Sequence, residues 1–201
     1  KSVTSPSSAV QFHYDADNIR VSKTVDGSET RFLIDQNRPF QEVLEEYLPG
    51  GTLTARYTHG LDLISQTRGG SRNYYHVDGL GNTRALSNAL KNVTDTYAYE
   101  AFGTLIARSG TEINSFLYIG EQRDLETGFT YLRARHMDSA IGRFLSRDPY
   151  DGNPIIPLSL HDFLYVDANP IMWVDPSGFV KIPPPTGRPN TWGNEYLTLT
   201  A

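Results

Sequence analysis

Three charged side chains in the C-terminal part of this 201-residue chain are the strongest candidates for chemistry: Arg135, Asp148 and Asp175. Two carboxyl groups held close together cannot both ionise cheaply, so one keeps a proton while the other acts as a base toward water or an amide. A neighbouring guanidinium favours the ionised form of one carboxylate and separates the two roles. If the fold brings these side chains together, they supply the groups that an aspartyl protease uses.

A purely structural interpretation of the same residues stands beside this one. Arg135 would pair with Asp138 or Asp148 as a buried ion pair, and the aspartates would cap turns. Asp175 opens the tetrad Asp-Pro-Ser-Gly, which is typical of a type I turn with Pro fixing φ at the second position and Gly closing. The spacing alone leaves both interpretations open.

Other arrangements that could do chemistry are weaker. The chain has no cysteine, which excludes disulfides, thiolate metal sites and thiol nucleophiles. Its five histidines do not fall at a metal-ligand spacing such as HExxH. Ser159, His161 and Asp162 are too close along the chain for a nucleophile triad, and no Gly-x-Ser-x-Gly, Walker A or dinucleotide motif occurs. We therefore expect no metal and no cofactor.

The elements that must position the candidate residues are predicted to be strands. Hydrophobic and polar residues alternate in segments such as 10–14 and 93–99, the period of half-buried strands. An aromatic or β-branched residue followed by a polar one recurs about every twenty residues, at Tyr14-Asp15, Ile34-Asp35, Tyr57-Thr58, Val77-Asp78 and Tyr99-Glu100. Turn residues mark the expected reversals at 16–18, 25–27, 49–51, 68–70 and 101–103. Each unit is then one hairpin, and hairpins pair side by side because a single one leaves its edges unpaired.

Two regions depart from this pattern. Residues 39–48 fit either a helical turn or a strand, and the alternation of Val43, Glu45 and Tyr47 favours a strand. From about Tyr118 the sequence becomes irregular and rich in Pro and Gly, so we expect it to leave the sheet and fold inward as a plug or cap, with helical content near 157–162.

The segment from Tyr74 to Gly178 resembles RHS/YD-repeat proteins, in particular the core domain that closes their shells. The matching pieces are YYHVDGLGNTRAL from Tyr74, TYAYEAFG from Thr96, YIGEQRDLETGFTYLRARHMD from Tyr118, GRFLSRDP from Gly142 and DPSG from Asp175. The chain departs from the family at Glu100, where Asp is usual, at residues 136–139, where Tyr-Tyr-Asp-Pro is usual, and after Asp148, where the DPxG tetrad is one residue longer.

This resemblance implies an all-β fold, a spiralling strip of antiparallel β-hairpins with an irregular C-terminal plug or cap. The expected domains are a YD-repeat hairpin strip over 1–117, an RHS-associated core or cap over 118–178, and the start of a variable C-terminal segment or linker over 179–201. The last of these is Pro-rich and polar, which is typical of extended sequence.

The resemblance also implies an activity. In bacterial toxin-complex components and secreted RHS effectors, an Arg and two Asp form an aspartyl protease that cuts its own chain after the second DPxG and frees an enclosed toxin segment. Carried over residue by residue, Arg135, Asp148 and Asp175 are catalytic and the cut bond is Phe179–Val180. The alternative is a structural or adhesion shell, as in animal teneurins, that is built but not cut.

Composition and charge restrict the partners. The net charge of -5 without a basic cluster makes nucleic acid an unexpected partner, and no apolar run is long enough to span a bilayer. The chain starts in mid-repeat, so we expect part of a larger bacterial protein that is secreted or at the cell surface. The expected partners are the rest of its shell, an enclosed C-terminal toxin segment and other toxin-complex or secretion-system subunits. Carbohydrate binding by exposed aromatic residues is a third, less favoured interpretation.

Overall fold

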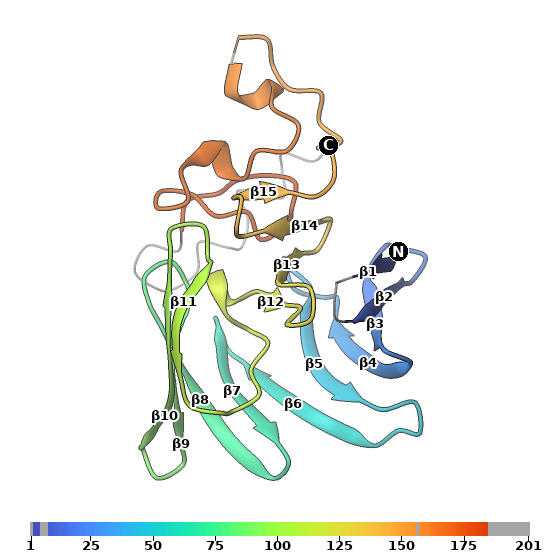
Figure 1. The fold of residues 1–201 in the computed structure, drawn as a ribbon, viewed down its shortest axis with the longest axis vertical. Helices are drawn as coiled ribbons and strands as arrows, with labels where there is room; N and C mark the ends of the chain where they lie inside the picture. The colour runs from blue at the N-terminus through green and yellow to red at the C-terminus, as the bar shows by residue number, and fades with distance from the viewer. Residues whose placement is uncertain (1, 5–7, 156, 185–201) are drawn as a thin grey trace.

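The computed structural model describes residues 2–4, 8–155 and 157–184, and these are almost entirely β (Figure 1). Over the described residues, eleven strands form one antiparallel sheet in which every strand pairs with its neighbours in sequence. We call this sheet the wall. Its strands are β1 (Ser2–Thr4), β2 (Ala9–Tyr14), β3 (Arg20–Val25), β4 (Ser28–Asp35), β5 (Glu42–Tyr47), β6 (Leu53–His59), β7 (Leu63–Arg68), β8 (Ser71–Val77), β9 (Thr83–Asn88), β10 (Val93–Tyr99) and β11 (Leu105–Ser109). The predicted all-β strip of hairpins is confirmed.

The turns of the wall follow from local sequence. All five predicted reversals lie between strands. Two of them, at Asp26-Gly27 and Gly69-Gly70, are two-residue connections in which both residues have positive φ, the hairpin geometry that matches the twist of the strands. The strand interpretation of residues 39–48 is also confirmed, since β5 begins at Glu42.

The sequence repeat corresponds to one structural device at one rim of the wall. Strands β2, β4, β6, β8 and β10 each have a shift of register near their end, which is the mark of a β-bulge. The shift lies between the last two residues of each strand except β4, where it lies between Leu33 and Ile34. In two of the turns that follow, Asp15 and Asp78 accept backbone N–H groups from the residues two and four positions further on. The carboxylate thereby satisfies the turn, which explains the polar residue after the aromatic one.

The segment from Tyr118 to Gly178, called the cap below, leaves the wall and forms a second sheet of four short strands. Its elements are η1 (Tyr118–Gly120), β12 (Gln122–Arg123), β13 (Phe129–Leu132), β14 (Arg135–Asp138), β15 (Arg143–Phe144), η2 (Pro157–Leu160) and η3 (Val166–Ala168). The cap lies over the rim that carries the bulged strand ends (Figure 1). The Tyr118 hydroxyl donates to Ala101 O at 2.9 Å and Ile119 N donates to Asn82 Oδ1 at 2.8 Å, so turns of the wall hold the start of the cap.

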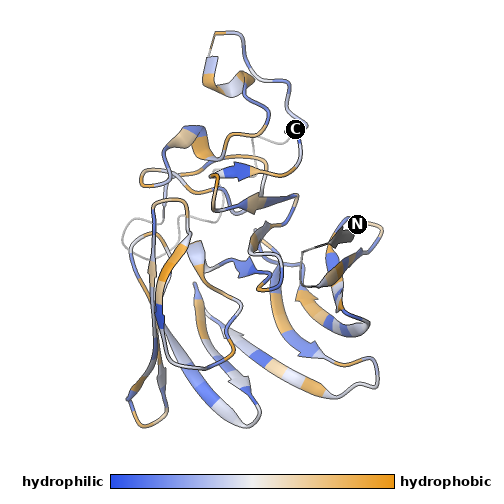
Figure 2. Cartoon of the chain, in the orientation of Figure 1, coloured by the Kyte–Doolittle hydropathy of each residue, from blue (hydrophilic) through white to orange (hydrophobic). Residues whose placement is uncertain are grey.

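Hydrophobic side chains are buried in separate clusters along the wall and within the cap. In β2, for example, Val10 and Phe12 are buried and their neighbours are exposed, and Figure 2 shows such alternation along the strands. The cap has its own cluster, built around Leu132 and Met137, both fully buried. The cap therefore has a core of its own while resting on the wall.

One buried ion pair joins wall and cap. Arg20 of β3 binds Asp124 Oδ2 through Nη1 and Gln122 Oε1 through Nη2, both at 2.7 Å. The side chains of Arg20 and Asp124 are 1% and 0% exposed. The guanidinium also lies 3.9 Å from the ring centroid of Tyr131 in the cap and 5.1 Å from that of Phe12 in the wall, so the charge is enclosed between wall and cap.

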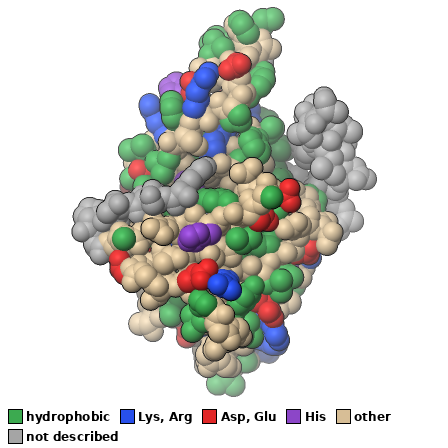
Figure 3. Space-filling view, turned by 90° about the vertical axis from the view of Figure 1, so that its right-hand side faces the viewer, with side chains coloured by type: hydrophobic (Ala, Val, Ile, Leu, Met, Phe, Trp, Pro, Cys, Tyr) green, Lys and Arg blue, Asp and Glu red, His purple; other side chains and the backbone are tan. Residues whose placement is uncertain are grey.

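The outer surface carries mixed charge, and residues 179–182 return to the cap. On the face in Figure 3, acidic and basic side chains are interspersed with hydrophobic ones. Among the described residues, no helix has the length and apolar character needed to cross a membrane. After Gly178 the chain folds back, and Ile182 pairs with Val174. Of the predicted segment 179–201, residues 185–201 lie outside the described residues.

Candidate active site

The tetrad of residues 175–178 forms a compact turn organised by one carboxylate. Asp175 Oδ1 accepts the Ser177 hydroxyl at 2.8 Å and three successive backbone N–H groups, those of Gly178 at 2.9 Å and of Phe179 and Val180 at 3.2 Å. Gly178 closes the turn at φ +71°, a conformation that costs glycine little. Asp175 itself is only 3% exposed, so these donors take the place of water around its carboxyl group.

Arg135, the first residue of β14, brings the two aspartates together. Its Nη1 lies 2.7 Å from Asp148 Oδ2 and its Nη2 lies 3.6 Å from Asp175 Oδ2, while Nε donates to Gly178 O. Its guanidinium stacks on Phe144 at 3.6 Å from the ring centroid. The three predicted side chains, separated by up to forty residues, thus meet around one guanidinium; their catalytic roles remain a prediction.

The structural interpretation of Arg135 also receives a partial answer. Arg135 pairs with Asp148, as one form of that interpretation expected, whereas the Asp138 carboxylate accepts the backbone N–H of Ala140 at 2.9 Å. Both aspartates of the site cap turns as well as binding Arg135. The same two carboxylates therefore stabilise turns and take part in a charged cluster.

Asp148 is the more accessible of the two carboxylates, with a side chain 21% exposed. Its Oδ1 accepts Tyr150 N at 2.9 Å, and its backbone N–H donates to Asp162 O at 2.8 Å. The extra residue of this longer tetrad comes after the hydrogen bond between Asp148 Oδ1 and Tyr150 N and before Gly152. Asp148 therefore keeps its place beside Arg135. Asp148 therefore has access to water that the buried Asp175 lacks.

Burial governs the proton affinities at the site. It raises the pKa of the Asp175 carboxyl above its ordinary value, and the bonds from Ser177, Arg135 and the backbone N–H groups oppose that shift without cancelling it. Burial also lowers the pKa of Arg135, against the opposing effect of Asp148 and Asp175. Asp175 accordingly keeps a proton more readily than an ordinary aspartate does.

The predicted cut bond lies directly beside this carboxylate. Val180 N, the nitrogen of the Phe179–Val180 bond, lies 3.2 Å from Asp175 Oδ1 and 3.1 Å from the Ser177 hydroxyl. Phe179 and Val180 are about half exposed, at 55% and 47%. The bond is thus within reach of both water and the acidic cluster.

Two residues with a place at the site were not identified from the sequence. Ser177 donates to Asp175 and accepts the N–H groups of Phe179 and Val180, and Arg133 donates to Pro176 O. Ser177 occupies the variable position of the tetrad, and Arg133 lies two residues before Arg135, so position in the motif was the available signal for each.

The other candidate arrangements do not form sites in the described part of the chain. Ser159 Oγ exchanges hydrogen bonds with the backbone of Asn153, and Asp162 accepts Arg147 Nε at 2.9 Å. No group of three or more His, Cys, Asp or Glu side chains among the described residues is arranged to hold a metal ion.

Comparison with known proteins gives a consistent result. A family model described as teneurin YD-shell matches residues 2–156. The tRNA nuclease WapA of Bacillus subtilis (strain 168) is 34% identical over 172 residues, which cover 83% of this chain and 7% of that protein. Salivary gland surface protein 1 of Aedes aegypti is 30% identical over 176 residues, covering 84% and 5%, and the probable deoxyribonuclease RhsA of Dickeya dadantii is 28% identical over 190, covering 86% and 12%.

Solved structures with the same fold include toxin-complex subunits. The crystal structure of TcdB2-TccC3 superposes with a TM-score of 0.63 at 17% identity, covering 86% of this chain and 9% of that one. The Tc holotoxin pore of Photorhabdus luminescens gives a TM-score of 0.63 at 16% identity, covering 92% and 9%. At this identity the likeness concerns the fold. The chain spans less than a tenth of the length of its WapA relatives.

Proposed function

Because the chain belongs to the teneurin YD-shell family of RHS/YD-repeat proteins, we propose that it closes a YD-repeat shell around a C-terminal toxin or effector segment and releases that segment by aspartyl self-cleavage after the DPSG tetrad. The protein then belongs to a larger exported or cell-surface assembly. Its partners are the rest of the shell, the enclosed segment and further subunits of a toxin complex or secretion system.

The observation that carries the proposal is the meeting of Asp148 and Asp175 at Arg135, beside the backbone that follows the tetrad. A single guanidinium that contacts one exposed and one buried carboxylate gives the two groups different environments. Different environments are what separates an acid from a base.

The cleavage can be written with these residues. Asp148, paired with Arg135 and open to water, takes a proton from a water molecule whose oxygen attacks the Phe179 carbonyl carbon. Asp175, whose pKa is raised by burial, supplies a proton to Val180 N as the carbon–nitrogen bond breaks. Atoms balance, since water is divided between a new carboxyl group on Phe179 and a new amino group on Val180.

The test is mass spectrometry of the purified full-length protein and of its Asp175→Asn variant. Wild type should yield two fragments divided at Phe179–Val180, and Asp175→Asn should stay intact, because Asn keeps the shape of Asp but cannot donate the proton. Asp138→Asn, which alters a turn-capping carboxylate elsewhere in the cap, is the matched control and should be cut like wild type.

Two results would overturn the proposal. The same two fragments from Asp175→Asn would show that Asp175 is not catalytic. An intact wild type would favour the alternative, a structural shell of the teneurin kind in which Asp175 only caps its turn.

A further inference from the structure

The turn between β13 and β14 binds the tetrad through one hydrogen bond from each of three successive residues. Residues 133–135 each donate to one carbonyl of residues 176–178, in the same order along both segments: Arg133 Nη1 to Pro176 O at 2.5 Å, Ala134 N to Ser177 O at 3.2 Å and Arg135 Nε to Gly178 O at 2.5 Å. Such matched bonds fix both the position and the direction of the tetrad backbone. We call this set of contacts the clasp.

The clasp leaves little room for movement. A Cβ added to Gly178 would collide with Leu132 O and lie 3.0 Å from Arg135 N, so the two segments are in direct backbone contact. Arg133 itself has φ +50°, an uncommon value for a residue other than glycine, which places its side chain across the tetrad. The contacts of the clasp therefore depend on this conformation of the turn between β13 and β14, and another conformation would break them.

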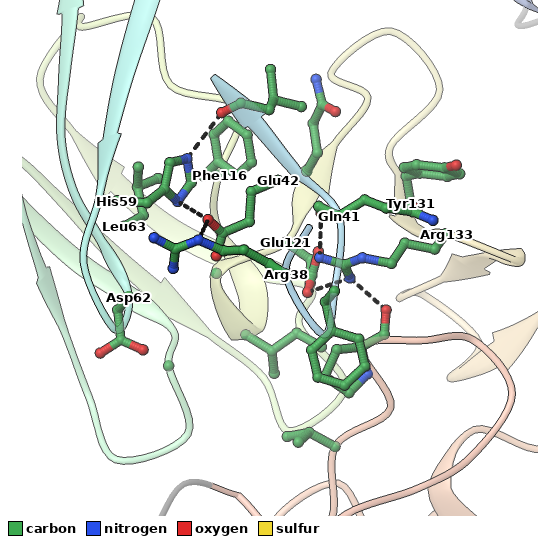
Figure 4. A pocket seen from close by; sticks show the side chains of 18 of the residues that line it. Arg38, Gln41, Glu42, His59, Asp62, Leu63, Phe116, Glu121, Tyr131 and Arg133 are labelled. Carbon is green, nitrogen blue, oxygen red and sulfur yellow. Dashed lines mark hydrogen bonds and ion pairs between the residues drawn. The ribbon is translucent and has the colours of Figure 1, made fainter. Parts of the chain in front are cut away.

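Arg133 extends the clasp to the wall. The same guanidinium donates through Nη2 to Gln41 O at 2.9 Å and through Nη1 to Glu121 Oε1 at 2.7 Å, and it lies 5.2 Å from the ring centroid of Phe40. Figure 4 shows Arg133, Gln41 and Glu121 together at the edge of a cavity of about 290 Å³ between wall and cap. One side chain thus touches the tetrad, the cap and the approach to β5.

We propose that Arg133 is a positioning residue that makes self-cleavage depend on the contacts between its side chain and wall residues 40–41. The inference rests on the proposed function and adds a condition to it. In the described part of the chain, no hydrogen bond or ion pair joins Arg133 to the Phe179–Val180 bond or to the carboxylates of Asp148 and Asp175; Arg133 acts through Pro176 and hence through the placement of Asp175.

The rigid shape of the Arg133 guanidinium couples its two backbone acceptors. Its nitrogens lie in one plane, so Nη1 reaches Pro176 and Nη2 reaches Gln41 together when the wall and the tetrad have a fixed relative position. If residues 40–41 move away from the cap, Arg133 loses the Gln41 acceptor and the Phe40 ring, and its side chain is free to leave Pro176. A shift of about 1 Å in a catalytic group can slow a reaction about 100-fold.

The test compares self-cleavage rates of full-length variants. The variant Arg133→Gln/Glu121→Gln removes the Arg133 contact of the clasp without leaving the Glu121 carboxylate unpaired, and it should be cut about 10- to 100-fold more slowly than wild type. Arg123→Gln is the matched control, because Arg123 is a cap arginine that donates to a wall carbonyl, Gly103 O at 3.2 Å, and makes no hydrogen bond to the tetrad among the described residues. It should be cut at the wild-type rate.

A double-mutant cycle separates positioning from general stability. Phe40→Leu weakens the wall contact of Arg133 and should slow cleavage several-fold in the wild-type background, yet have no effect once Arg133 is Gln. Additive effects of the two changes, or wild-type cutting by Arg133→Gln/Glu121→Gln, would overturn the inference.

Hydrogen exchange makes the outcome independent of cleavage itself. In an Asp175→Asn background, Arg133→Gln should speed exchange of the backbone N–H groups of residues 178–180, whereas Arg123→Gln should not. If wild type is never cut but this exchange difference appears, the proposed function fails while the clasp stands. Equal exchange in the two variants would refute the clasp directly.

Discussion

Breaking the buried Arg20–Asp124 pair from one side should destabilise the fold more than breaking any surface ion pair of the described residues, and Asp124→Asn tests that expectation. The substitution preserves shape but leaves the Arg20 guanidinium, 1% exposed, without its 2.7 Å carboxylate partner. Breaking a buried pair in this way costs about 3–5 kcal/mol. Since the bond to Gln122 and the contact with Tyr131 remain, we expect a loss at the lower end, about 3 kcal/mol.

The assay is thermal and urea unfolding of wild type and variants. For a chain of this size about 3 kcal/mol corresponds to a fall in Tm of about 6–12 °C. Glu126→Gln is the control, because the Lys23–Glu126 pair is partly exposed, at 14% and 26%, and should contribute less than about 1 kcal/mol. Arg20→Met/Asp124→Leu should recover most of the loss, since Phe12, Phe32 and Tyr131 surround the site. A loss below about 1 kcal/mol in Asp124→Asn would refute the reasoning.

Two further predictions concern the tetrad. Because burial raises the pKa of Asp175, the folded chain holds that proton to higher pH than the unfolded chain, so the stabilisation is full below about pH 4 and is lost as pH rises through the folded pKa; the unfolding free energy of wild type relative to Asp175→Asn should therefore fall as pH rises above about 4, and parallel curves would contradict this. Gly178→Ala should cost more than the roughly 1–2 kcal/mol expected for a left-handed alanine, because its Cβ collides with Leu132 O, whereas Gly69→Ala, with positive φ and open space, should cost only that amount in urea unfolding.

Local chemistry made the wall predictable from the sequence. Pairs of an aromatic or β-branched residue and a polar one, such as Tyr14-Asp15 and Val77-Asp78, indicated the hairpin period, and Asp-Gly or Gly-Gly pairs indicated reversals, because both signals depend on residues a few positions apart. The register shifts at the strand ends were not predicted, since a bulge adds one residue without changing the alternation on either side.

Contacts between distant segments were harder to predict. Arg135, Asp148 and Asp175 were found through motifs shared with a family, and the structure places them together. Arg20 and Asp124 are 104 residues apart, and nothing in either neighbourhood identifies the other. Arg133 was not identified from the sequence for the same reason, because the residues that accept its hydrogen bonds, Gln41 and Pro176, lie far from it in the sequence and on different elements.

The bulge that ends strands β2, β4, β6, β8 and β10 has a consequence for how such walls evolve. Each bulge bends its own strand and increases the local twist, so curvature is generated inside every hairpin and needs no external support. A gene duplication that adds one whole hairpin would therefore lengthen the wall without changing its curvature per hairpin.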